Sequence, residues 1–216
     1  MHTSAMNSFY AEDQIDRVVR EAFFKDYSYK GVIVEVGAAG PEYLSISRHF
    51  RENGWRVLAI EPNPEFCELH KKAGFAVLQY ACGDHDQDNV DFEVVYQPAE
   101  YKGGRVTYES FSSLKVLDSY RALKPDIKTR TIKVNLRRLD TILAEHAPDV
   151  RTIDILTIDV EGWELTVMAG LSLERHKPKV IIMENFLDDQ KYRTYMRELG
   201  YRLYREMSPN DIYVAS

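Results

Sequence analysis

The chain has 216 residues, of which 44% are apolar, and its formal net charge at pH 7 is -6. This length and composition suit one large domain with a sizeable core and argue against disorder. The acidic balance disfavours a general nucleic-acid-binding protein, because neutralising a phosphate backbone needs a basic surface.

Cysteine content and apolar runs bear on where the protein works. Cys67 and Cys82 are the two cysteines, and their number and spacing suggest neither a disulfide framework nor a zinc site. No apolar run has the length needed to span a bilayer, and residues 1–14 lack the apolar centre of a signal peptide. We therefore expect a cytoplasmic protein without a membrane span, and the sequence leaves its oligomeric state open.

Helix and strand patterns alternate along most of the chain. Residues 11–25 have apolar side chains at helical spacing, and we interpret residues 1–30 as a helical segment that covers the site like a lid, ahead of a main domain over 31–216. The next predicted strands and helices come in turn: strand 31–36, helix 43–53, strand 55–60, helix 64–73 and strand 75–80.

The second half of the chain is predicted in the same way. A strand over 90–96 precedes a predicted loop over 97–125, and the later elements are strand 131–136, helix 140–146, strand 153–158, helix 163–169, strand 180–184 and helix 188–199. Two further strands flank Ser208-Pro209-Asn210, which suits an antiparallel hairpin. The whole pattern predicts a doubly wound α/β fold, with a mostly parallel sheet of about seven strands and this hairpin at one edge.

Polar and acidic residues gather where the predicted parallel strands end. Ligands of open α/β sheets bind beyond the carboxyl ends of the strands, and burying acidic groups there without a partner would be unfavourable. The five ends are Glu35-Val36-Gly37, Glu61-Pro62-Asn63, Ala81-Cys82-Gly83-Asp84, Asp159-Val160-Glu161-Gly162 and Glu184-Asn185.

The first strand ends in a glycine-containing turn, in which Gly37 and Gly40 let the backbone turn tightly and admit a ligand. A dinucleotide-binding turn would need glycines at positions 39 and 42, where this chain has Ala39 and Glu42. Glu35 and Glu42 would also place negative charge beside a pyrophosphate. S-adenosylmethionine, which has a sulfonium, an ammonium and a carboxylate but no phosphate, fits this turn better.

Glu61 ends the second strand, 24 positions after Gly37, where an acid commonly accepts hydrogen bonds from ribose hydroxyls. Its alternative interpretation is a surface residue ahead of a helix that Asn63 caps. Together with the glycine turn, the ribose role is favoured. Cys82 and Asp84 are candidates for contact with the adenine, although Asp84 is equally well explained as a turn residue in the polar stretch GDHDQDN.

At this point the chain resembles a known family. The segments VEVGAAG, AIEPNP, ACGD, LRRLDTIL and DILTIDVEGWELTVMAG, in this order, are similar to the FkbM family of S-adenosylmethionine-dependent methyltransferases, over roughly residues 31–186. Family members are mostly O-methyltransferases that act on hydroxyls of sugars or natural products. The resemblance implies a Rossmann-like methyltransferase domain, with Glu35, Gly37 and Glu61 at the cofactor and Asp159 and Glu161 at the reaction centre.

Residue identities and resemblance together give a predicted site. We expect the cofactor to contact Glu35, Gly37, Ala38, Gly40, Glu61, Pro62, Asn63, Cys82 and Asp84. The predicted catalytic residues are Asp159, Glu161 and Glu184, and Asp159 and Glu184 are also candidate ligands of Mg²⁺ or Mn²⁺. One departure from the family is Ala39, where many relatives have Asn.

Methyl transfer to an alcohol needs an aligned acceptor and a way to remove its proton, through either a base or a metal that lowers the hydroxyl pKa. Asp159, Glu161 and Glu184 suit either role, although Glu161 alone is also explained as a favourable charge in the first turn of a helix. Ser112 and Ser113, in the predicted loop, are weaker candidates for substrate contact.

The predicted function is O-methylation of a hydroxyl on a sugar, glycan or related polyol, so the expected partner is a small molecule or glycan and not a nucleic acid. Two alternatives stay open at this stage. One is a dinucleotide-dependent oxidoreductase, which the absent glycines disfavour. The other is a non-catalytic cofactor-binding domain, against which Asp159 and Glu184 count modestly.

Overall fold

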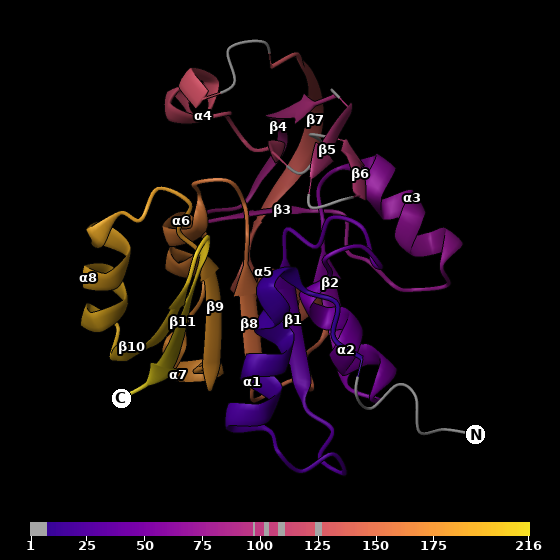
Figure 1. Ribbon diagram of the computed structural model, residues 1–216. Coiled ribbons are helices and arrows are strands. Elements are labelled where there is room, and N and C mark those ends of the chain that lie inside the picture. The colour runs from indigo at the N-terminus through magenta and orange to yellow at the C-terminus, as the bar shows by residue number, and fades with distance from the viewer. Residues whose placement is uncertain (1–7, 97, 102–103, 108–110, 124–126) are drawn as a thin grey trace.

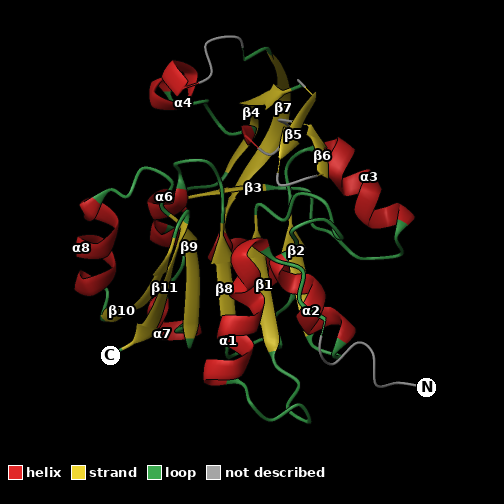
Figure 2. Cartoon of the chain, viewed as in Figure 1, coloured by secondary structure: helices red, strands yellow, loops and turns green. Residues whose placement is uncertain are grey.

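The computed structural model describes residues 8–96, 98–101, 104–107, 111–123 and 127–216. A six-stranded main sheet is flanked by helices, and a three-stranded sheet lies above the upper ends of its strands in the view of Figures 1 and 2. None of the helices in these described ranges combines the length and apolar composition that a membrane crossing requires.

The main sheet has the strand order β10-β11-β9-β8-β1-β2. Strands β2, β1, β8 and β9 run parallel, and β11 pairs antiparallel with both β9 and β10. Its strands are β1 (Val32–Val36), β2 (Arg56–Ile60), β8 (Ile155–Ile158), β9 (Val180–Glu184), β10 (Tyr201–Met207) and β11 (Asn210–Ala215). The α/β class and the C-terminal hairpin are thus confirmed, and β8 lies next to β1.

The predicted seven-stranded, mostly parallel sheet is wrong, because residues 75–80 do not form a strand of the main sheet. Only Leu78 makes an isolated parallel bridge, to Ile60 at the edge of β2. Tyr80 N then donates a hydrogen bond to Leu78 O, two residues earlier, at 3.1 Å, and the chain turns away from β2. Most of this stretch is half-buried or exposed, so it lacks the two covered faces that keep a parallel strand in a sheet.

The chain continues instead into a second sheet with the order β3-β7-β4. Its strands are β3 (Ala81–Gly83), β4 (Gln87–Val95) and β7 (Thr129–Arg138). The loop predicted over 97–125 is also wrong in its described part, which contains a hairpin of β5 (Pro98–Tyr101) and β6 (Gly104–Thr107) and the helix α4 (Asp118–Leu123). Self-paired backbone hydrogen bonds hold such a hairpin without the apolar alternation used to predict strands.

Most helices lie close to their predicted positions, but the short helix over residues 173–176 was not predicted from the sequence. They are α1 (Ile15–Phe23), preceded by a 3₁₀ turn (Glu12–Gln14), α2 (Ile46–Glu52), α3 (Pro64–Lys72), α5 (Leu139–His146), α6 (Glu164–Ala169), α7 (Leu173–His176) and α8 (Gln190–Glu198). Local sequence explains where α3 begins: Asn63 Oδ1 accepts a hydrogen bond from Glu65 N at 3.0 Å, and Pro64 occupies the first turn.

Two hydrophobic cores fill the space between the helices and the faces of the main sheet. On one face, α1 and α2 pack Ile15, Val19 and Phe50 against Ile33 and Ile155. The other face is covered by α5, α6 and α8. Helices on both faces make the sheet doubly wound and leave the ends of the strands as the place where a ligand can enter.

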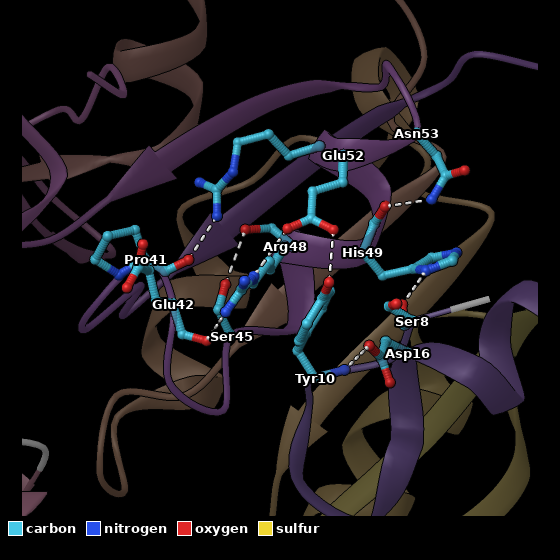
Figure 3. A network of polar contacts seen from close by, with 12 residues as sticks. Ser8, Tyr10, Asp16, Pro41, Glu42, Ser45, Arg48, His49, Glu52 and Asn53 are labelled. Atoms are coloured by element: carbon cyan, nitrogen blue, oxygen red, sulfur yellow. Dashed lines mark hydrogen bonds and ion pairs between the residues drawn. The ribbon is translucent and has the colours of Figure 1, made fainter. Parts of the chain in front are cut away.

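Polar contacts tie the start of the described chain to α2 (Figure 3). The Tyr10 hydroxyl donates to Glu52 at 2.7 Å, and the Tyr10 backbone N–H donates to Asp16 at 2.7 Å. His49 Nδ1 lies 2.7 Å from Ser8 O. Because these contacts join the packing of α1, the described part of the 1–30 segment forms a layer of the fold, and its role as a lid stays a prediction.

This packing gives a test of whether α1 belongs to the core. Ile15 is only 1% exposed, so Ile15→Ala should lower the free energy of unfolding by about 2–5 kcal/mol, the usual cost of emptying a buried aliphatic site. Arg17→Ala, on the exposed side of the same helix, should change it by less than about 0.5 kcal/mol. Chemical denaturation measures both. Equal, small effects would mean that α1 is detached from the core.

Candidate active site

A cavity opens at the carboxyl ends of β1, β2 and β8. It holds about 630 Å³ of empty space, including its open mouth. The main sheet contributes the residues that follow its strands, among them Gly37, Glu61 and Asp159, and the second sheet contributes Cys82 from β3 and Phe92 from β4. The remaining lining residues are Val36, Ala39, Pro62, Phe66, Tyr80, Ala81, Ser112, Ser113, Leu114, Val160, Glu161 and Trp163.

The backbone around Gly37 requires a glycine at this position, independently of any ligand. Gly37 has a φ of +78°, and a Cβ placed on it would lie 1.7 Å from the backbone oxygen of Asp159. The turn therefore touches the end of β8 with no room for a side chain, so the space that glycine leaves at this position is filled by protein. Gly40 differs, because an added Cβ would meet only Leu69 Cδ1, at 3.7 Å.

Glu61 fastens the glycine turn to the start of α3. Its two carboxylate oxygens accept hydrogen bonds from Ala39 N at 2.9 Å and from Asn63 N at 2.8 Å. Burial raises the pKa of this carboxyl to about 7, although the two backbone donors act in the opposite direction. Glu61 therefore shapes the cavity wall while facing it, at the position expected for a ribose partner.

The other predicted cofactor contacts are placed unevenly. Glu35 is buried and accepts hydrogen bonds from Ser47 Oγ (2.6 Å) and Ser47 N (3.2 Å), so it anchors the start of α2 rather than lining the cavity. Cys82 lines the cavity, and burial raises the pKa of its thiol, which keeps it protonated. Asp84 is exposed, bonds to His85 Nδ1 at 2.6 Å and does not line the cavity.

Of the remaining predicted contacts, Pro62 lines the cavity. Ala38, Gly40 and Asn63 lie beside it without lining it. Asn63 is instead the cap of α3. The structure thus brings together the glycine turn, the end of β2 and the end of β8, whereas the contact roles of the individual residues stay predictions.

Three carboxylates lie close together at the cavity, which Asp159 and Glu161 line and Glu184 does not. One oxygen atom from each of Asp159, Glu161 and Glu184 lies within 4.8 Å of the others. Glu161 and Glu184 are buried, at 5% and 6% exposure, and Asp159 is the most open of the three. Strands β8 and β9 pair in parallel, so Asp159 and Glu161, which follow β8, lie beside Glu184 at the end of β9.

Crowding and loss of hydration make these groups hard to ionise together. Burial and then the charge of Glu164 raise the pKa of Asp159 to about 7, and Glu12 on the 3₁₀ turn adds to this effect. Burial and the neighbouring Asp159 raise the pKa of Glu184 well above its usual range. Because the Asp159 and Glu184 carboxyls are close together and their pKa values are both raised, chiefly by burial, ionisation of both is unfavourable without a cation.

Glu164 is a residue of this site that sequence reasoning missed. One of its carboxylate oxygens accepts hydrogen bonds from Val160 N (3.1 Å) and Gly162 N (2.9 Å), and the other accepts from the Tyr192 hydroxyl (2.5 Å). It therefore holds the tight loop in which Glu161 has a φ of +60°. The acid in the first turn of the helix was the available signal.

Comparisons with known proteins agree with this geometry. Residues 35–203 match the methyltransferase FkbM domain. The chain belongs to the FkbM methyltransferase family. This confirms the family resemblance found in the sequence motifs and favours methyl transfer over dinucleotide-dependent chemistry.

A fungal relative and a solved bacterial structure are similar to this FkbM-family chain. Methyltransferase 1 of Beauveria bassiana (strain ARSEF 2860) is 28% identical over 171 residues, which are 74% of this chain and 65% of the relative. This chain therefore spans somewhat less than two thirds of that relative. The crystal structure of methyltransferase FkbM from Methylobacillus flagellatus KT has a TM-score of 0.51 at 15% identity, covering 89% of this chain and 46% of the other, which shows a shared fold.

The close approach of Gly37 to Asp159 predicts the effect of a single methyl group. Gly37→Ala should lower the free energy of unfolding by more than about 2 kcal/mol, because the new Cβ collides with backbone and φ is positive. Gly40→Ala, in the same turn, has room and should change it by less than about 1 kcal/mol. Equal thermal stability of the two variants would contradict the contact between the turn and β8.

The raised pKa of Glu61 predicts how the ligand-free protein responds to pH. A carboxyl whose folded pKa (about 7) exceeds its unfolded value (4.5) contributes stability that is fully present below about pH 4.5 and lost as pH rises through 7. Glu61→Gln stays neutral, so its unfolding free energy should fall less than that of the parent between pH 5 and 8. The exposed Glu174→Gln should keep the parental slope. Parallel curves for all three proteins would show that the Glu61 carboxyl is normally ionised.

Proposed function

We propose that this FkbM-family protein transfers the methyl group of S-adenosylmethionine to a hydroxyl of a sugar, glycan or related polyol. The observation that carries the proposal is the cluster of Asp159, Glu161 and Glu184, of which Asp159 and Glu161 line the cavity together with Gly37 of the glycine turn. A cluster of acids next to a cofactor site suits a reaction in which a sulfonium donates a methyl group and a hydroxyl loses a proton.

The charge and the aromatic residues of the cavity lining support S-adenosylmethionine as the cofactor. None of the lining residues in the described ranges is Lys or Arg, which disfavours a pyrophosphate-containing cofactor and suits a cationic one. Glu61 would accept hydrogen bonds from the ribose hydroxyls, and the aromatic walls of Phe66, Tyr80 and Phe92 suit a flat base. When bound, S-adenosylmethionine supplies the activated methyl carbon.

Asp159 is the residue we assign to the acceptor proton. It follows β8, and the neighbouring strand β1 carries the glycine turn. Because Asp159 also lines the cavity, its carboxylate would lie between the bound cofactor and the acceptor. The strongly raised pKa of Glu184 favours its neutral form, and a neutral Glu184 would leave Asp159 as the proton acceptor. With its pKa near 7, Asp159 is matched to neutral pH, where a general base works best.

The same carboxylates are suited to a divalent cation. Oxygen ligands from three acids are the donor set that Mg²⁺ and Mn²⁺ prefer, and a cation would offset the repulsion that raises their pKa values. Asp159 and Glu184 would hold it, with Glu161 beside them, and a hydroxyl bound there would lose its proton more readily. The acidic surroundings also support a neutral acceptor rather than DNA or RNA.

The decisive experiment is a screen of sugars, glycans and polyols with S-adenosylmethionine, analysed by mass for the gain of one methyl group. On an acceptor found this way, Asp159→Asn should reduce turnover at least about a hundredfold while cofactor affinity, measured by calorimetry, changes little. Exposed Glu174→Gln is the matched control and should keep parental turnover. Near-normal turnover of Asp159→Asn would remove this residue from the chemistry.

Two further measurements separate the alternatives. Loss of activity in chelator that Mg²⁺ or Mn²⁺ restores would assign the carboxylates to a metal, and activity that ignores chelator would assign Asp159 to direct proton removal. Binding of NAD but not of S-adenosylmethionine by the parent protein would overturn the proposal. Binding of S-adenosylmethionine without turnover on any acceptor would favour a non-catalytic domain.

A further inference from the structure

Ser113 places a buried hydroxyl in the wall of the cavity with no use in the fold. Its backbone pairs with Glu93 of β4, through Glu93 N to Ser113 O at 2.9 Å and Ser113 N to Glu93 O at 3.1 Å. Its side chain is 2% exposed and lines the cavity. Within the part of the chain that the structure describes, Ser113 Oγ has no hydrogen-bond partner.

The neighbouring Ser112 shows what a structural hydroxyl looks like here. It lines the same cavity, but its Oγ accepts a hydrogen bond from Val95 N at 3.0 Å. That bond and the pairing with Glu93 together fix the segment against β4. A buried hydroxyl without a partner lowers stability, so the orphaned Ser113 Oγ needs an explanation outside the ligand-free fold.

The surroundings of Ser113 indicate which part of a ligand it meets. The next residue, Leu114, packs in one apolar cluster with Ala81 and Phe92, and all three line the cavity. Ala81, Phe92 and Leu114 carry no charge, whereas Asp159 and Glu161 bring carboxyl groups to the lining of the same cavity. A flat heteroaromatic group with hydrogen-bonding atoms on its rim suits an apolar wall that carries a single hydroxyl.

We propose that the Ser113 hydroxyl hydrogen-bonds the purine base of the cofactor, an inference that rests on the proposed function. The hydroxyl both donates and accepts, so it can pair with a ring nitrogen or with the exocyclic amine. Neither predicted adenine partner competes well for this role. Asp84 is exposed outside the cavity, and the thiol of Cys82 is a weak hydrogen-bonding group.

The test is a titration of S-adenosylhomocysteine, the demethylated cofactor, into the parent protein and single variants. Ser113→Ala should bind it about threefold to tenfold more weakly, the usual effect of losing one neutral hydrogen bond. Ser113→Thr keeps the hydroxyl and should bind within about twofold of the parent. Glu174→Gln, which changes an exposed residue outside the cavity lining, is the control and should keep the parental affinity.

Thermal unfolding of the ligand-free proteins supplies a readout that a structural role would not give. Ser113→Ala should unfold at the parental temperature or above it, since it removes an orphaned polar atom. Ser112→Ala should unfold at a lower temperature, because the buried Val95 N–H loses its acceptor. A lower melting temperature for Ser113→Ala, or parental affinity in that variant, would overturn the proposal.

A truncated ligand locates the contact. 5′-Methylthioadenosine keeps the base, ribose and sulfur of the cofactor but lacks its amino-acid end. In competition with S-adenosylhomocysteine, 5′-methylthioadenosine should lose affinity for Ser113→Ala by the same factor as S-adenosylhomocysteine does. If only S-adenosylhomocysteine loses affinity, the hydroxyl contacts the amino-acid end of the cofactor and the proposal is overturned. Failure of the parent protein itself to bind S-adenosylhomocysteine would instead count against the proposed function.

Discussion

The contact between Gly37 and the backbone of Asp159 is the constraint on which the site depends. An added Cβ would lie 1.7 Å from the Asp159 oxygen, so the turn after β1 and the residue that ends β8 meet as backbone against backbone. The parallel pairing of β1 with β8 brings the two strand ends to the same edge, and the missing side chain lets them touch. The sheet itself thereby places Asp159, the residue proposed to take the acceptor proton, beside the turn proposed to bind the cofactor.

That placement concentrates negative charge, and the surrounding structure offsets part of the repulsion. Backbone N–H groups stabilise Glu61 and Glu164, each of which accepts two of them. Among the described residues, no backbone N–H group is recorded as a donor to the Asp159 or Glu184 carboxyl, and burial raises the pKa of both. The fold therefore keeps Glu61 and Glu164 hydrogen-bonded to the backbone. It leaves Asp159 and Glu184 able to bind either a proton or a cation.

The main sheet could be predicted from sequence because its signals are local. Apolar β-branched runs gave β1, β8 and β9, and the acid or glycine at each strand end gave the position of the cavity. Residues 75–80 defeated the same reasoning, since their apolar run matches a strand while the bend at Tyr80 carries the chain into another sheet. Whether a short strand joins one sheet or another is decided by tertiary packing, which periodicity does not report.

Residues of the candidate site that lie at strand ends of the main sheet could also be predicted from the sequence, whereas Glu164 could not. Glu61 and Asp159 line the cavity because strand ends define it, but Asp84 was misleading: it follows a strand of the second sheet and points to solvent. Glu164 went unrecognised as a site residue because its significance comes from a contact over a long sequence distance, to Tyr192. Ser113 was only a weak candidate, because its pairing with Glu93 of β4 could not be read from the loop sequence. Partner choice at such distances leaves no periodic signal in the chain.

The two sheets contribute differently to a single cavity, and this explains its unsatisfied polar atoms. The main sheet supplies charge at fixed positions, whereas the second sheet supplies an apolar wall that carries isolated polar groups. Ser113 Oγ lines the cavity, is buried and has no hydrogen-bond partner among the described residues, which lowers the stability of the protein without a ligand. A ligand that pairs with this hydroxyl binds the folded state alone, so its binding energy also stabilises the fold. The unpaired polar group that lowers the stability of the protein without a ligand is thus also the group that a ligand must pair with. Lower stability and ligand selectivity therefore have the same physical origin.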